Sequence, residues 1–236
     1  MAVHDQLLGV TQPVLSISLE PGESVIAETA AFAWMTDSIQ MAAGPATLSA
    51  YTAKGTPGTI AFASRLPGTI TSLEVRPDRE YLVHRQGLLA STPGIEVTTG
   101  FRQPFRPASR EPGEFVLLRV SGSGRAWIDL SGDIVPRDLV AGSSLRTLPS
   151  HIGICEASVA VQMAELAHLT PRSADARHFA VLSGPGSVWL QSMPLAGHVR
   201  LLTASSAAPG GPAVEGAAGL PDPDYALPEH SEVAGT

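Results

Sequence analysis

Hydrophobic residues occur along the chain in short runs, each bounded by glycine, proline or small polar residues. The runs at Leu48–Tyr51, Phe115–Val120 and Phe179–Leu182 have the length and composition of β-strands. Each run precedes a Gly-containing turn and a further apolar run, a pattern that predicts a β-hairpin. Helical spacing is scarce, although Met163–Leu169 could form a short helix before Pro171. The chain is therefore expected to be all-β.

The apolar pattern repeats three times. Residues 75–100 align with residues 19–44 at an offset of 56, and a third copy begins at Leu139, at an offset of 120 from the first. One copy alone has too few strands to bury both of its faces, so each copy needs its neighbours. We therefore expect three tandem units, like jelly rolls or β-sandwiches, arranged around a pseudo-threefold axis. The expected units span about 14–73, 74–137 and 138–203.

Composition supports one globular domain followed by a tail. Of the 236 residues, 44% are hydrophobic and only 16% are charged, which is unlike a disordered chain. After about Thr203 the apolar pattern ends, and the chain becomes rich in alanine, glycine and proline. We expect a single all-β domain over 1–203 and a flexible C-terminal tail over 204–236.

Charge and cysteine content restrict the partners and the location. The formal net charge is −7, which disfavours binding to nucleic acid because phosphate backbones are also negative. Cys155 is the only cysteine, so an intramolecular disulfide cannot form, which fits a reducing compartment. The N-terminal sequence resembles neither a secretory signal nor a transit peptide, and no apolar run is long enough to span a membrane. A cytoplasmic location is expected.

Several segments resemble a known family. The most specific are Gln86-Gly-Leu-Leu-Ala-Ser-Thr-Pro-Gly94 and Gly184-Pro-Gly-Ser-Val-Trp-Leu-Gln191. Over about residues 14–200 the order of motifs is similar to the altered-inheritance-of-mitochondria family, number twenty-four. The resemblance implies three fused copies of the fold of the tryptophan RNA-binding attenuation protein, and it supplies no catalytic residues. The segment 42–47 stands where family members carry a longer Gly-rich loop, so a role of that loop is in doubt here.

Residues with catalytic or metal-binding chemistry do not form a recognisable motif. The seven histidines are isolated from one another, which disfavours a histidine-based metal site. Cys155 lies in an apolar run, where an inert buried thiol is favoured over a reactive one. Asp129, Asp133 and Asp138 cluster, but turn hydrogen bonds explain them better than acid–base catalysis does. We expect no enzyme activity, no cofactor and no bound metal.

One segment has a composition that suits a binding site. Arg102, Phe105, Arg106 and Arg110 bring arginine and aromatic side chains together in an acidic chain. Arginine suits anionic ligands and phenylalanine can stack on rings, so these four residues are the candidate site for a partner or an anion. The alternative is an ordinary solvated loop whose phenylalanines fold back onto the core.

These observations favour a non-catalytic binding or scaffolding protein that binds a protein partner or, as a homo-oligomer, itself. A small-molecule-binding protein or an enzyme, with a site between the repeats, is the alternative. RNA binding would rest on analogy of fold alone, and the acidic charge disfavours it.

Overall fold

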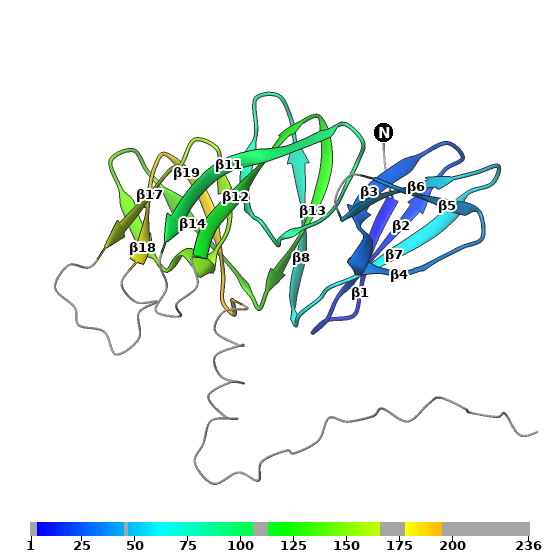
Figure 1. The fold of residues 1–236 in the computed structure, drawn as a ribbon, viewed down its shortest axis with the longest axis horizontal. Helices are drawn as coiled ribbons and strands as arrows, with labels where there is room; N and C mark the ends of the chain where they lie inside the picture. The colour runs from blue at the N-terminus through cyan, green and yellow to red at the C-terminus, as the bar shows by residue number, and fades with distance from the viewer. Residues whose placement is uncertain (1–3, 45–46, 106–112, 166–177, 195–236) are drawn as a thin grey trace, which may run out of the picture. The chain divides into compact units, whose positions relative to one another are not determined.

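Most of the described residues lie in β-strands, and every strand pair among them is antiparallel. The computed structural model describes residues 4–44, 47–105, 113–165 and 178–194, all within a compact unit over 1–199 (Figure 1). Their only helices are two 3-10 turns, η1 (Thr29–Ala31) and η2 (Pro149–His151). The all-β prediction is therefore confirmed. The short helix expected from Met163 is wrong in its first part, since Met163 lies in a strand, and its remainder lies outside the described residues.

A short first strand, β1 (His4–Leu8), precedes three successive sets of six strands. The first set comprises β2 (Val14–Leu19), β3 (Ser24–Glu28), β4 (Phe32–Met35), β5 (Ile39–Ala43), β6 (Leu48–Ala53) and β7 (Gly58–Ala63). The second set comprises β8 (Gly68–Val75), β9 (Tyr81–His84), β10 (Leu88–Ser91), β11 (Ile95–Phe105), β12 (Gly113–Gly122) and β13 (Gly124–Ser131). The third set comprises β14 (Ile134–Leu139), β15 (Ser144–Thr147), β16 (Ile152–Glu156), β17 (Ala160–Glu165), β18 (His178–Ser183) and β19 (Gly186–Gln191).

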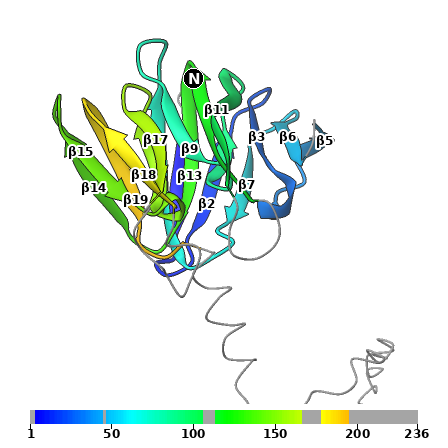
Figure 2. The same ribbon diagram turned by 60° about the vertical axis from the view of Figure 1, so that its left-hand side comes forward.

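The strands form four sheets, and each set of six contributes to two of them. The sheet orders are β1-β2-β7-β4, β5-β6-β3-β10-β13-β8, β11-β12-β9-β16-β19-β14 and β15-β18-β17. In every set the sixth strand pairs between the first and the third, and the fifth pairs between the fourth and the second. The two six-stranded sheets arise where β3 pairs with β10 and where β9 pairs with β16. Figure 2 shows β14 beside β19, the pair that ends the third sheet.

The Gly-containing turns lead the chain from one sheet to another, so the three predicted hairpins are wrong. Strands β6 and β7 lie in different sheets, as do β12 and β13, and β18 and β19. Gly122 and Gly124, at the second of these turns, have φ angles of +100° and +152°, which other residues rarely adopt. The order strand, glycine turn, strand occurs both in a hairpin and where the chain crosses from one sheet to another, so the sequence order does not distinguish the two. The consecutive strands that do pair within a set are β5 with β6, β11 with β12, and β17 with β18.

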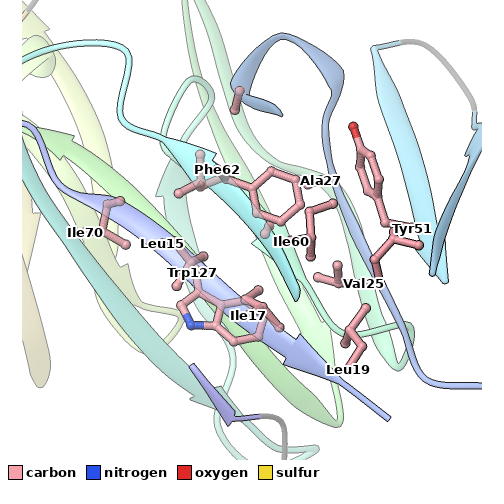
Figure 3. Packing of buried hydrophobic residues seen from close by; sticks show 14 of the residues in the cluster. Leu15, Ile17, Leu19, Val25, Ala27, Tyr51, Ile60, Phe62, Ile70 and Trp127 are labelled. Atoms are coloured by element: carbon pink, nitrogen blue, oxygen red, sulfur yellow. The ribbon is translucent and has the colours of Figure 1, made fainter. Parts of the chain in front are cut away.

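Three hydrophobic clusters fill the spaces between successive sheets. The first lies between the first and second sheets and includes Leu15, Ile17, Phe62 and Trp127 (Figure 3). The second lies between the second and third sheets, and the third between the third and fourth. Strand β13 serves two clusters, because successive side chains of a strand point to opposite faces. The six-stranded sheets are therefore buried on both faces, the second sheet along β13 and the third along β9.

Strand β1 fastens the N-terminal end of the described chain to the second set. The Oδ1 atom of Asp5 accepts a hydrogen bond of 2.5 Å from Nη1 of Arg125, and its Oδ2 atom accepts one of 2.9 Å from Nε1 of Trp127. A single carboxylate thus pairs with a guanidinium and satisfies the only polar group of a buried indole. The contact explains why Trp127 is tolerated in the core.

The expected unit boundaries at about 73 and 137 fall inside β8 and β14, whereas one strand set gives way to the next between β7 and β8 and between β13 and β14. The pseudo-threefold axis stays a prediction. The tail over 204–236 lies outside the described residues.

Candidate functional site

Strand β4 is the last strand of the first sheet and carries three large apolar side chains that remain exposed. Phe32, Trp34 and Met35 have exposed fractions of 38%, 48% and 37%. Within the described part of the chain, β4 pairs on one side only, with β7. The strand Phe-Ala-Trp-Met carries no charge and no proline, the usual protections of a free edge. It presents unpaired backbone groups beside an apolar surface.

The two strands that correspond to β4 are buried. At offsets of 56 and 120, Trp34 corresponds to Ala90 in β10 and to Ile154 in β16, which are 1% and 0% exposed. All three strands carry a register shift at the same relative position, next to Trp34, Ala90 and Ile154. The difference is that β10 and β16 each pair on a second side with a strand of the preceding set, whereas β4 belongs to the first set of the described chain and pairs there with β7 alone.

A complementary free edge lies on β15, the first strand of the fourth sheet. Strand β15 corresponds to β3 and β9, whose second sides pair with β10 and β16. In the described residues β15 pairs with β18 alone. Arg146 lies in the middle of β15, with its guanidinium carbon 5.4 Å from the centre of the Phe179 ring. Leu148, just after the strand, is 42% exposed. We call β4 and β15 the two free edges.

The residues predicted as a site from the sequence lie on another part of the fold. Arg102 is in β11, where its Nε atom lies 2.6 Å from Oε1 of Glu114 on β12, and the neighbouring rings of Phe101 and Phe115 pack against each other. Phe105 ends β11, and Arg106 and Arg110 lie outside the described residues. Arg102, the one arginine of this candidate site within the described residues, therefore already has an acidic partner.

Replacing Arg102 with alanine should change the free energy of unfolding by less than about 1 kcal/mol, because its pair with Glu114 is exposed and screened by water. Chemical denaturation measures this change, with Glu114→Ala as the matched control. A loss above about 2 kcal/mol for either variant would show that the pair fastens the β11–β12 hairpin.

Burial shifts the pKa of two potentially reactive side chains away from neutral pH. Burial lowers the pKa of His84 on β9 to about 4, and the charge of Arg85 adds to the effect, so the imidazole is neutral. Cys155 is fully buried, and burial raises the pKa of its thiol to about 12. The thiolate, which is the reactive form, is therefore rare.

The three clustered aspartates have separate structural partners. Asp129 accepts hydrogen bonds from Oγ of Ser64 at 2.7 Å and from the backbone N–H of Arg65 at 3.3 Å. Burial raises its pKa, and these hydrogen bonds act in the opposite direction. Asp138 accepts from Oγ of Ser187, whereas Asp133 uses its backbone N–H to donate to Oγ of Ser192. These contacts agree with roles in turns and strand pairing.

Groups of three or more His, Cys, Asp and Glu side chains that could hold a metal ion do not occur among the described residues. Neither 3-10 turn, the only helical structure in that part of the chain, has the length or hydrophobicity to cross a membrane.

The fold defines a class of antiparallel all-β protein in which two of the four sheets in the described chain are shared between successive sets of strands. The chain belongs to the family described as Mitochondrial biogenesis AIM24, whose model matches residues 6–193. The match confirms the resemblance seen in the sequence.

A solved structure supports the same fold. The X-ray structure of protein SPYM3_0169 from Streptococcus pyogenes is similar with a TM-score of 0.73, covering 86% of this chain and 100% of that chain at 16% sequence identity. At this identity the likeness shows the fold alone. None of the curated proteins matches the sequence.

Sequence reasoning missed β4 because its composition is that of a core strand. Trp34 aligns with two residues that are buried, so the apolar pattern alone predicts that Trp34 is buried as well. A usable signal was position within the repeat, since the end units of a repeat chain leave surfaces that internal units cover.

Proposed function

We propose that this member of the AIM24 family is a non-catalytic binding or scaffolding protein, built from three repeated β units. It acts by binding a protein partner, or another copy of itself, through a free sheet edge. It carries no cofactor, does not bind nucleic acid and works in the cytoplasm, where its single reduced thiol is stable.

The observation that carries the proposal is the free edge of β4. An exposed edge strand offers unpaired N–H and C=O groups to a strand of a partner, and neighbouring apolar side chains add specificity. Aromatic residues and methionine are enriched where proteins meet, and Phe32, Trp34 and Met35 are of these types. The acidic net charge of −7 supports a protein partner over a nucleic acid. The biogenesis role in the family description fits an assembly protein.

The test is affinity capture with the immobilised full chain. Trp34→Glu should abolish capture of a partner or of a second copy, because a charge would be buried at the pairing surface. Val10→Glu is the matched control, since Val10 is 92% exposed in a turn away from β4 and should capture as well as the native chain. Equal capture by Trp34→Glu and the native chain would contradict binding through this edge.

A further inference from the structure

Every sheet in the described chain has two end strands. Most of these end strands occupy the same position within each of the three sets. The fourth strand of each set, β5, β11 or β17, ends a sheet. The first strands β8 and β14 also end sheets, and β2 differs only because β1 covers it. Only β4 and β15 are ends in one set and internal in the others, so among the described strands these two edges lack a partner that the fold supplies elsewhere.

The two internal junctions share one register. In the first junction Ala90 pairs with Ala27 and Ser91 with Ile26. In the second junction Ile154 pairs with Val83 and Cys155 with Leu82. The offsets of 56 and 120 carry each pair of the first junction onto a pair of the second. Applying these offsets to a junction between β4 and β15 places Trp34 opposite Thr147 and Met35 opposite Arg146.

The geometry points to head-to-tail self-association, in which β4 of one copy pairs antiparallel with β15 of a second copy in this register. The inference rests on the proposed function and names the partner as the chain itself. A second copy is favoured over the chain's own β15 because both strands are sheet ends in the same structure. Trp34 and Met35 would then become buried, as their equivalents Ala90, Ser91, Ile154 and Cys155 already are.

The chemistry of the two edges is compatible. Neither strand contains proline, and β4 brings no charge of its own opposite Arg146. The methylene stem of arginine can pack along an apolar partner while its guanidinium stays in water. Each copy presents one edge of each kind, so the contact is heterologous and copies add until a ring closes or a filament grows.

Cysteine cross-linking tests the register directly. Residues directly opposite each other in antiparallel strands have Cα atoms about 4.5–5.5 Å apart, which suits a disulfide. Met35→Cys and Arg146→Cys are prepared as separate full-length variants, mixed and oxidised. We expect a disulfide-linked dimer of unlike copies in high yield from the mixture and little from either variant alone. Cys155 is fully buried and is present in every sample, so the single variants also control for its background.

Ser144→Cys mixed with Met35→Cys is the off-register control, since Ser144 lies two residues from the position predicted to face Met35. A yield from the Arg146→Cys mixture no higher than from this control would overturn the register. The double variant Met35→Cys with Arg146→Cys should form a ladder of covalent multimers. A cross-linked monomer alone would show that the chain closes on itself and would overturn the inference.

Light scattering of the native chain separates this inference from the proposed function. The native chain and Val10→Glu should form oligomers, whereas Trp34→Glu should be monomeric at the same concentration. A monomeric native chain that still captures another protein through β4 would overturn self-association and leave the proposed function in place. Oligomers that bind nothing else would support self-association while removing the role as a scaffold for other proteins.

Discussion

Replacing Trp127 with alanine should lower the free energy of unfolding by about 3–5 kcal/mol, the range for removing a buried large aromatic side chain. Trp127 is 1% exposed and fills the cluster between the first and second sheets beside Leu15, Ile17 and Phe62 (Figure 3). Its loss would leave a cavity and would also free the carboxylate of Asp5. Denaturant unfolding of purified protein measures the change.

Two variants separate the ring from its hydrogen bond. Trp127→Phe keeps much of the ring volume but removes the indole N–H, and it should cost clearly less than Trp127→Ala. Asp5→Ala leaves the ring in place, removes the acceptor for both Trp127 and Arg125, and should cost about 1–3 kcal/mol. A loss below about 1 kcal/mol for Trp127→Ala would show that the indole does not support the packing between these sheets.

Acid should destabilise the protein through His84. The unfolded chain binds a proton at this residue with a pKa near 6.5, whereas the folded chain does so only near 4. Between these values the unfolded state holds more protons, so the free energy of unfolding falls as the pH falls from about 6.5 to 4. The full difference amounts to about 3 kcal/mol.

The matched variant is His84→Gln, which keeps a polar side chain but cannot titrate. Subtracting its pH profile from the native one isolates the histidine from the carboxyl groups. The subtraction is needed because burial raises the pKa of Asp129, so the folded state takes up that proton more readily and gains stability as the pH falls. The native chain should lose more stability than the variant between pH 6.5 and 4. Parallel profiles would mean that His84 is hydrated in the folded protein.

The sequence was sufficient for the strands but not for their partners. Leu48–Tyr51, Phe115–Val120 and Phe179–Leu182 lie within β6, β12 and β18, because apolar content and turn residues are local properties. Pairing depends on contacts with segments that lie far away in the chain. Strand β6 pairs with β3 rather than with β7, and no residue between β6 and β7 encodes that choice.

The candidate sites show the same contrast between what residue type reveals and what depends on strand pairing. The chemistry of Arg102 was evident from its residue type, but its pairing with Glu114 depends on the register of β11 against β12. The exposure of Trp34 could not be read from an apolar run, since the corresponding runs around Ala90 and Ile154 are buried. What differs is whether a neighbouring strand exists, which is a property of the assembled sheets.

The sharing of sheets between strand sets affects how the molecule can come apart. Cutting the chain between β13 and β14 would remove β14, β16 and β19 from the third sheet and would leave β9 without its neighbour β16. A third of the molecule therefore cannot melt while the rest stays intact, because each junction is a row of backbone hydrogen bonds with a core on either face. The described chain should unfold in one cooperative transition, and its three strand sets, although alike in pairing order, are not interchangeable modules.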